Sequence, residues 1–457
     1  DGPSREITRP GAVVIFSAGQ PISAALELPP DGLTLGRELP RGLFERDDRV
    51  SRMHARIARV GSGFRVDDLG SRNGTFVNGE RIGEGYNAQG GAIVRIGRSL
   101  LWLVDDVTPF TRPKQEHDSG VGPVLGGRLL RAFAAIRSAS RSGDPLCLRG
   151  ESGAGKELAA RAFHEAKFGE SGREPFVAVN CAAIPEGLAE RLLFGAKRGA
   201  YSGATADSDG YVQAAHGGTL FLDEIAELDP LVQAKLLRVL ETREVLQLGA
   251  SKPRKVEIQV CVASHKSLRD EVAQGRFRED LYFRVGRPEV YVPPLRERLD
   301  EVPWLVQREL TAISNNNPSL PEKAVLRGTV NFIEAIALRA WPGNVRELLR
   351  EVRRAAHQAL EASTVHVDAV HLAEDAGRGF VAPASESAAP PKALLPSDAE
   401  IERALAENGN NVRGTARALG VHRNQLRRWL ARRNGEKGAE LTELDGPDGP
   451  EDDVEEP

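Results

Sequence analysis

Cysteine, methionine and long apolar runs are scarce in this sequence of 457 residues, and each shortage excludes a class of protein. Three cysteines occur, Cys147, Cys181 and Cys261, far apart in apolar segments that we expect to be buried strands. Their spacing matches neither a disulfide framework nor a zinc site. No apolar run approaches the roughly 18 residues of a membrane span, and the amino end lacks a signal-peptide pattern. We therefore expect a cytoplasmic protein with no membrane partner.

Charge is distributed unevenly along the chain. The formal net charge is −4, yet the last 22 residues, 436–457, hold ten acidic residues and one lysine. The average therefore hides a basic body and an acidic tail. The length and the 40% share of hydrophobic residues suit a soluble protein of two to four domains. Because the chain opens at Asp1 and its one methionine is Met53, we expect that its natural start precedes this sequence.

Hydrophobic patterns predict a multidomain protein. Short alternating apolar runs separated by Gly, Asn and Asp turns indicate an all-β domain at residues 8–105, followed by a polar linker at 106–122. From 123 to 300, strand-type runs alternate with helical patterns, which predicts a parallel α/β sheet. Residues 301–375 change to helical periodicity and predict a helical subdomain.

The last part of the chain has no long apolar segment. Residues 376–396 are rich in Ala, Pro and Ser, which is typical of a flexible linker. Residues 397–434 form a short basic segment with helical periodicity. The acidic tail at 435–457 has too few apolar residues to support a core.

A phosphate-binding motif opens the α/β domain. Seven residues match G-x-x-x-x-G-K directly after an apolar strand and at the start of a helix: Gly150, Glu151, Ser152, Gly153, Ala154, Gly155 and Lys156. The glycines allow backbone N–H groups to surround nucleotide phosphates, and Lys156 neutralises the terminal phosphates. Glu157 stands where a magnesium-binding Ser or Thr is usual.

A second motif, which is acidic, is expected to supply the ligand for the metal ion. The apolar strand Thr219–Leu222 ends in Asp223 and Glu224. We assign Asp223 to Mg²⁺ and Glu224 to activation of an attacking water, because hydrolysis of ATP needs one carboxylate for each task. The alternative is an acidic helix cap after a core strand, which the upstream phosphate motif makes less favourable.

Together these residues resemble the central AAA+ domain of bacterial sigma-54-dependent transcription activators over residues 124–372, in which Glu157 is a common variant. The resemblance implies that Asn180 contacts Glu224 and reports the γ-phosphate, and that His265 lies at the sensor I position. It further implies that Arg278 and Arg284 are arginine fingers that reach a neighbouring subunit's nucleotide, that Arg346 faces the phosphates, and that the chain forms a hexameric ring.

A small-residue loop lies between the two nucleotide motifs. Its six residues are Gly199, Ala200, Tyr201, Ser202, Gly203 and Ala204. Without a family resemblance, the residue pattern favours the interpretation as an ordinary glycine-rich turn. The loop resembles the GAFTGA loop of the same family, with one aromatic ring and one hydroxyl each replaced conservatively. The resemblance implies contact with sigma-54 RNA polymerase during ATP hydrolysis.

The amino-terminal β domain resembles a forkhead-associated (FHA) domain. A phosphopeptide site needs a guanidinium, a hydroxyl and amide donors around one dianion, and the loops of this domain contain each type. The resemblance implies that Arg37, Ser51, Arg52 and Asn73 contact phosphothreonine and its peptide, and that His54 supports the loop. A degenerate scaffold without a ligand is the alternative. A Ser/Thr kinase is the implied upstream partner.

The carboxyl-terminal segment resembles a Fis-type helix-turn-helix. Three short helical patterns end in a basic helix after the turn Gly420–Val421. Five side chains of that helix suit base edges and phosphates: Arg423, Asn424, Gln425, Arg427 and Arg428. A solvated basic helix without DNA contact is the alternative.

The sequence therefore predicts an ATP-hydrolysing activator of sigma-54 polymerase, with ATP and Mg²⁺ bound, upstream DNA as a target and phosphothreonine as its control signal. Two other functions stay open. One is a phosphopeptide-binding adaptor with an inactive ATPase core, and the other is a DNA-binding regulator that acts through the ordinary sigma factor.

Overall fold

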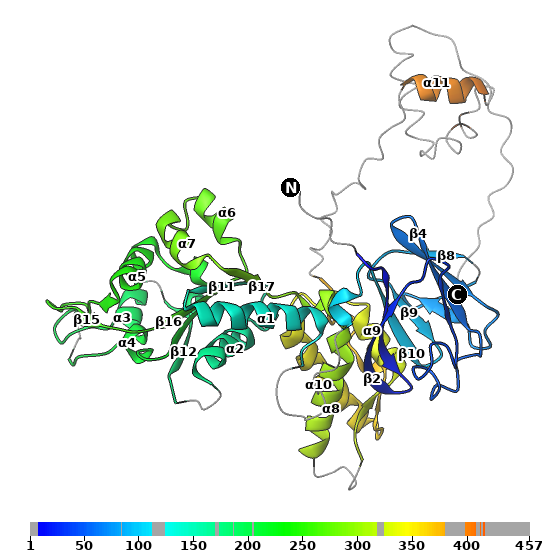
Figure 1. The fold of residues 1–457 in the computed structure, drawn as a ribbon, viewed down its shortest axis with the longest axis horizontal. Helices are drawn as coiled ribbons and strands as arrows, with labels where there is room; N and C mark the ends of the chain where they lie inside the picture. Colours follow the sequence, from blue (N-terminus) through cyan, green and yellow to red (C-terminus); the bar gives the residue numbers. More distant parts are fainter. Residues whose placement is uncertain are drawn as a thin grey trace, which may run out of the picture. The chain divides into compact units, whose positions relative to one another are not determined.

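Figure 1 shows the computed structural model of the chain. It describes residues 8–83, 85–111, 124–169, 173–185, 187–202, 205–317, 324–379 and 398–407, with residues 412 and 415. The chain divides into two units, residues 1–380 and residues 381–457. Among the described residues, no helix is both long enough and apolar enough to cross a membrane.

Two antiparallel sheets form the amino-terminal domain, as the turn-rich alternating sequence predicts. The six-stranded sheet has the order β2-β1-β10-β9-β6-β7 and the four-stranded sheet the order β3-β4-β5-β8. The bounds are β1 Gly11–Ser17, β2 Gln20–Glu27, β3 Leu33–Leu35, β4 Ala55–Val60, β5 Gly63–Asp68, β6 Thr75–Val77, β7 Glu80–Ile82, β8 Tyr86–Ala88, β9 Ile93–Ile96 and β10 Ser99–Val104.

The central strands β1 and β10 are buried on both faces. Ala12 and Val14 face the core between the two sheets, whereas Val13 and Ile15 belong to a second core on the outer face. The second core continues through Val107 and the 3₁₀ helix Thr108–Phe110. The first residues of the predicted linker at 106–122 are therefore packed against the protein rather than exposed, because Val107 and Phe110 are apolar.

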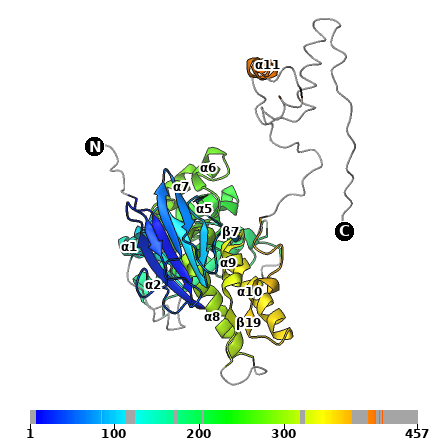
Figure 2. The ribbon, with the colours of Figure 1, turned by 90° about the vertical axis from the view of Figure 1, so that its right-hand side faces the viewer.

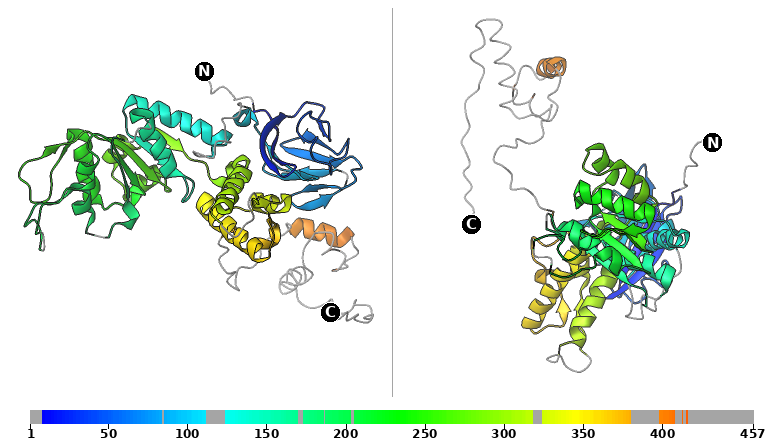
Figure 3. Two further views of the ribbon diagram at one scale, coloured as in Figure 1. Left: turned by 90° about the horizontal axis from the view of Figure 1, so that it is seen from below. Right: turned by 90° about the vertical axis from the view of Figure 1, so that its left-hand side faces the viewer.

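A five-stranded parallel sheet in the order β12-β13-β16-β11-β17 forms the α/β domain. Its strands are β11 Leu146–Arg149, β12 Phe176–Asn180, β13 Thr219–Asp223, β16 Gln259–Ser264 and β17 Glu289–Tyr291. Helices cover both faces (Figure 3), so the strands are apolar on both sides. The helices are α1 Gly127–Ser142 and α2 Lys156–Phe168 on one face, and α3 Ala189–Phe194, α4 Tyr211–Ala214, α5 Pro230–Thr242, α6 Leu268–Ala273 and α7 Glu279–Val285 on the other.

The three cysteines have free thiols and are buried, as the sequence predicts, although Cys181 lies outside the strands. Cys147 and Cys261 lie in adjacent strands, and Cys181 begins a 3₁₀ helix directly after β12. Burial raises the pKa of the Cys147 thiol to about 12, so this thiol is protonated at neutral pH.

The helical subdomain, called the lid below, consists of α8 Val302–Asn315, α9 Val330–Ala337 and α10 Asn344–Glu361, with the short strands β18 Arg327–Gly328 and β19 His366–Val367. Thr329 caps α9 by accepting a hydrogen bond from the Phe332 N–H. The apolar faces of the lid helices and the outer face of the six-stranded sheet contribute to one core. Figure 2 shows α9 beside the strands of the amino-terminal domain.

The second unit has one described helix, α11 Asp398–Glu407. The Thr415 hydroxyl donates to the Ala404 carbonyl at 3.4 Å. This helix coincides with the start of the predicted basic helical segment. The residues predicted to contact DNA, Arg423 to Arg428, lie outside the described residues.

Candidate nucleotide site and ligand-binding loops

The predicted phosphate-binding loop connects β11 to α2, as its motif requires. Gly153 and Gly155 have φ angles of 73° and 105°, in the left-handed region that favours glycine. A Cβ atom on Gly153 would lie 2.3 Å from the Gly343 carbonyl oxygen of the lid. A Cβ atom on Gly155 would meet nothing within 4 Å, so space remains open above this part of the loop.

Lys156, which is buried, and Glu224, which is partly buried, form an ion pair at the base of this loop. The Lys156 Nζ lies 2.9 Å from Glu224 Oε1 and donates to the Gly150 carbonyl at 3.0 Å. The other carboxylate oxygen of Glu224 accepts from the backbone N–H of His265 at 3.1 Å and lies 2.6 Å from His265 Nδ1. Burial raises the pKa of Glu224, but the hydrogen bonds from Lys156 and His265 outweigh it and hold the pKa below its ordinary value.

The two acidic residues at the end of β13 differ in electrostatic environment. Burial raises the pKa of Asp223, and the charge of Lys156 only partly opposes this effect. Glu224 has a φ of 54°, a left-handed conformation that is uncommon for a residue with a side chain. Opposite pKa shifts in neighbouring carboxyl groups and a strained backbone are typical of functional sites.

The start of α10 closes over the phosphate-binding loop. The buried Asn344 side chain donates to the Ser152 carbonyl at 3.0 Å and to Glu151 Oε2 at 3.1 Å. Arg346 Nη1 donates to the Ser152 hydroxyl at 3.4 Å, which places this predicted contact beside the loop. Glu151 is also held by two hydrogen bonds from Arg296, and its pKa lies below the ordinary value chiefly for this reason.

Sequence reasoning missed three residues that hold this loop. They are Asn344, Arg296 and Arg298, whose Nη2 donates to the Ala154 carbonyl at 2.5 Å. Arg298 is buried and pairs with Glu301, which in turn accepts from the Gly126 N–H before α1. For Arg296 and Arg298 the only sequence signal is a largely charged run at 296–301 between apolar segments, and that pattern also fits a surface turn. For Asn344 the signal is its position two residues before Arg346.

A pocket of about 350 Å³ lies between the phosphate-binding loop, the ends of β12 and β13, and the lid. Among its lining residues are Lys156, Asn180, Asp223, Glu224 and Arg346. The Asn180 side chain accepts from the Ala182 N–H, and its expected contact with Glu224 is not formed among the hydrogen bonds of the described residues. His265 and Lys156 take that place, because both donate to the Glu224 carboxylate.

These residues fit a magnesium–nucleotide complex. Mg²⁺ is commonly held by one or two carboxylates together with substrate phosphates, and Asp223 lines the pocket beside Lys156. Glu157 also lines the pocket, but its carboxylate pairs with Arg161 one helical turn away. No group of three or more His, Cys, Asp or Glu side chains among the described residues forms a metal site of its own.

The two predicted finger arginines do not line this pocket. Arg278 precedes α7 and makes two hydrogen bonds to Asp280, the shorter at 2.7 Å. Arg284, in the last turn of α7, donates to the Leu240 carbonyl at 3.2 Å. In the single chain both are therefore held by local partners.

Four residues of the predicted sigma-54 loop are described, Gly199 to Ser202, whereas Gly203 and Ala204 lie outside the described residues. The Tyr201 ring is 38% exposed, and its hydroxyl accepts from Arg191 Nη1 at 2.8 Å. The Arg191 guanidinium also lies over the ring, 5.1 Å from its centre. The segment before the loop is anchored, because Ala196 bridges to Ser208 and Leu248.

The predicted phosphothreonine residues gather in two loops of the β domain. Arg37, Ser51 and Arg52 lie between β3 and β4, and Asn73 lies between β5 and β6. The Arg37 side chain donates to the carbonyls of Val50 and Asp48, and the Asn73 amide donates to the Arg49 carbonyl at 2.7 Å. Both Arg37 and Asn73 therefore support the loop that carries Ser51, and both are exposed.

His54 is fully buried and connects the two loops. Its Nδ1 accepts from the Ser51 N–H at 3.0 Å, so its Nε2 carries the proton and donates to the Gly74 carbonyl at 3.2 Å. Burial lowers the pKa of His54, which keeps this ring neutral. These contacts agree with a structural role for His54.

Comparison with protein families supports all three domain predictions. The FHA domain family matches residues 33–97, the sigma-54 interaction domain matches residues 127–290, and the bacterial regulatory proteins of the Fis family match residues 398–432. The nitric oxide reductase transcription regulator NorR1 of Cupriavidus necator is 39% identical over 361 residues, which is 73% of this chain and 69% of NorR1. The chain belongs to the sigma-54-dependent transcriptional activators.

The chain is similar to further regulatory proteins and solved structures. The Nif-specific regulatory protein of Herbaspirillum seropedicae is 41% identical over 243 residues, which is 53% of this chain and 43% of that protein. The crystal structure of NtrX from Brucella abortus superposes with a TM-score of 0.50 at 29% identity, covering 68% of this chain and 69% of NtrX. The chain spans about half the length of the first curated relatives that it matches. The predicted family and fold are confirmed.

Proposed function

We propose that this activator hydrolyses ATP in the pocket around Lys156 and uses the energy to remodel sigma-54 RNA polymerase in the cytoplasm. The observation that carries the proposal is the convergence of Lys156, Asp223 and Glu224 on one pocket that the lid residue Arg346 closes. In the same proposal, the FHA loops bind a phosphothreonine protein, and the basic helix at 423–428 binds upstream DNA.

The chemistry follows from the contacts of Glu224. In the structure this carboxylate is held by Lys156 and His265. A γ-phosphate would attract Lys156 by its greater negative charge, which frees Glu224 Oε1 to accept a proton from an attacking water. Asp223 would hold Mg²⁺, which would neutralise negative charge at the phosphates. The contact between His265 and Glu224 then keeps the carboxylate oriented.

The complete site needs a second copy of the chain. Arg278 and Arg284 lie away from their own pocket, and their guanidinium groups suit the charge that develops on a transferred phosphoryl group. A ring, hexameric by resemblance to the family, would bring them to the neighbouring nucleotide. The exposed ring of Tyr201 would then contact sigma-54 on one face of this ring.

ATP turnover measured against protein concentration, with and without a phosphothreonine peptide, tests the proposal. We expect turnover per chain to rise cooperatively with concentration, to be lost in Glu224→Ala, and to respond to the peptide only when Arg37 is intact. Glu227→Ala is the matched control, because Glu227 follows three residues later and pairs with Lys266 outside the pocket.

Two outcomes would redirect the assignment. Negligible turnover at all concentrations together with tight peptide binding would support the phosphopeptide adaptor. Cooperative turnover with no effect on open-complex formation by sigma-54 polymerase would support a regulator of the ordinary sigma factor.

A further inference from the structure

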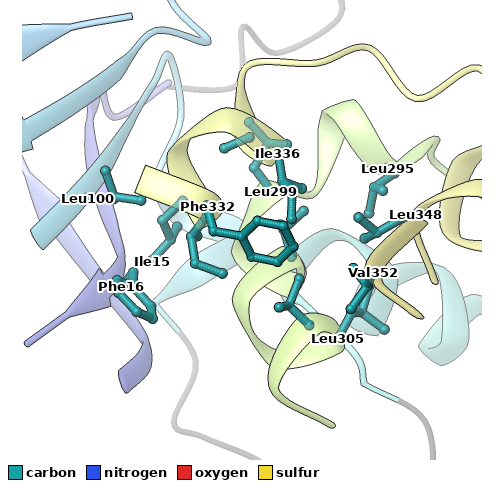
Figure 4. Close-up of a cluster of buried hydrophobic side chains, with 14 of the residues drawn as sticks. Ile15, Phe16, Leu100, Leu295, Leu299, Leu305, Phe332, Ile336, Leu348 and Val352 are labelled. Carbon is teal, nitrogen blue, oxygen red and sulfur yellow. The ribbon is translucent and has the colours of Figure 1, made fainter. Parts of the chain in front are cut away.

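The FHA domain and the lid are joined by one hydrophobic core. On the FHA side the core includes Ile15, Phe16 and Leu100 from the outer face of the six-stranded sheet. On the lid side it includes Phe332 and Ile336 of α9 (Figure 4). Interfaces of this apolar kind restrict the relative motion of domains. By contrast, the lid contacts the phosphate-binding loop mainly through polar groups, Asn344 and Arg346.

An ion pair lies at the edge of this interface. Arg95 of β9 donates to Glu334 of α9 at 2.7 Å, and the two side chains are 17% and 7% exposed. The Arg95 guanidinium also lies 3.7 Å from the centre of the Phe76 ring, on the neighbouring strand β6. A pair that is this buried has few alternative partners, so loss of one member leaves the other charge without compensation.

On its FHA side the ion pair is close to the predicted phosphothreonine loops. Strand β6 begins at Thr75, directly after Asn73 and Gly74. Gly74 is held by His54, which also holds Ser51. A ligand that rearranges these loops would therefore act on the strand that carries Phe76.

On its lid side the ion pair is connected to the nucleotide pocket through the segment from α9 to the start of α10. Glu334 lies on α9, and the buried Trp341 donates from its indole N–H to the Ile336 carbonyl at 2.8 Å. Three residues further, Asn344 holds the phosphate-binding loop through Ser152 and Glu151. Side-chain contacts joined by short backbone segments thus lead from Asn73 to Ser152.

We propose that the outer face of the six-stranded FHA sheet is a docking surface for the lid, and that through it phosphopeptide binding and nucleotide binding are coupled. The identity of the two ligands rests on the proposed function, whereas the docking rests on the contacts above. Coupling of this kind is reciprocal, so each ligand changes the affinity for the other by the same factor.

The test uses the full chain and the charge of one residue. The dissociation constant of a fluorescent ATP analogue is measured with a phosphothreonine peptide library and with the same library dephosphorylated. We expect the phosphorylated library to change this constant by about fivefold or more in the unmodified chain. Glu334→Arg should reduce the change to less than about twofold, and the exchange Arg95→Glu with Glu334→Arg should restore it.

Arg65→Glu is the matched control, because Arg65 is an exposed FHA arginine that pairs with Asp67 within its own domain. It should retain the coupling of the unmodified chain. Full coupling in Glu334→Arg, with normal affinity for each ligand alone, would overturn the proposal.

Hydrogen exchange separates this proposal from the choice of FHA ligand, because it needs nucleotide alone. On addition of nucleotide, the amides of β1 and β10 should change their protection together with those of α9, and Glu334→Arg should remove the change in the strands. If α9 and α10 respond while β1 and β10 do not, the docking proposal is wrong even if peptide binding is intact. If no library member binds but the strands respond, the phosphothreonine assignment fails and the docking proposal is supported.

Discussion

Replacement of Phe332 by alanine tests whether the FHA domain and the lid are stabilised by one core. The Phe332 ring is fully buried between the two domains (Figure 4). Removing a buried phenylalanine ring loses its transfer free energy of about 1.5–3 kcal/mol and leaves a cavity, so we expect a total loss of about 3–5 kcal/mol. For a cooperative body of 150–250 residues, each kcal/mol lowers Tm by about 2–4 °C, which predicts a decrease of roughly 6–20 °C.

Calorimetry of the full chain without nucleotide measures this effect, and hydrogen exchange assigns the transition to β1, β10 and α9. Phe283→Ala is the matched control, because the Phe283 ring is 72% exposed and the same substitution there should change the free energy of unfolding by less than about 0.5 kcal/mol. The shared core would be refuted if Phe332→Ala lowered the stability of the lid alone and left the FHA strands unchanged.

Three further predictions address single contacts. Glu224→Gln should lower ATP turnover by about 100-fold or more while nucleotide affinity is kept, because the proton acceptor is lost but Lys156 remains; single-turnover kinetics and equilibrium binding measure the two effects. Burial lowers the pKa of His54, so the unfolded chain binds a proton near pH 6.5 that the folded domain excludes. FHA stability should therefore fall as pH falls below about 6.5, and His54→Asn should flatten this dependence in denaturant titrations at several pH values. Tyr201→Phe removes the hydrogen bond from Arg191 but keeps the ring, so sigma-54 binding in a pull-down should persist in Tyr201→Phe and be lost in Tyr201→Ala.

The sequence alone predicts the candidate site residues that lie within short segments. The phosphate-binding loop follows from seven consecutive residues, since glycine geometry and one lysine must occur at fixed spacing before a helix. The Asp223–Glu224 pair follows from its position after an apolar strand. The loop at 199–204 and the FHA loops are predicted by resemblance, and the structure shows that His54 joins the loops that carry Ser51 and Asn73.

Contacts between segments that are distant in the chain could not be predicted from the sequence. Asn344 and Arg298 reach the phosphate-binding loop from more than 140 residues away, and no sequence pattern predicts that their partners are the Ser152 and Ala154 carbonyls. Asn180 was expected to contact Glu224, yet Lys156 and His265 hold that carboxylate. Which donor satisfies a buried carboxylate depends on distances of a few tenths of an ångström, which only the packed structure sets.

The packing of the FHA domain against the lid most clearly separates what the sequence predicts from what the tertiary structure determines. The apolar residues on both faces of β1 and β10 are visible in the sequence, and they already determine that each face must be covered. The sequence does not show which element packs on the outer face. Burial of apolar surface is non-directional, so any complementary apolar face could cover these strands. The tertiary structure decided it, by placing Phe332 against that sheet and Glu334 within reach of Arg95.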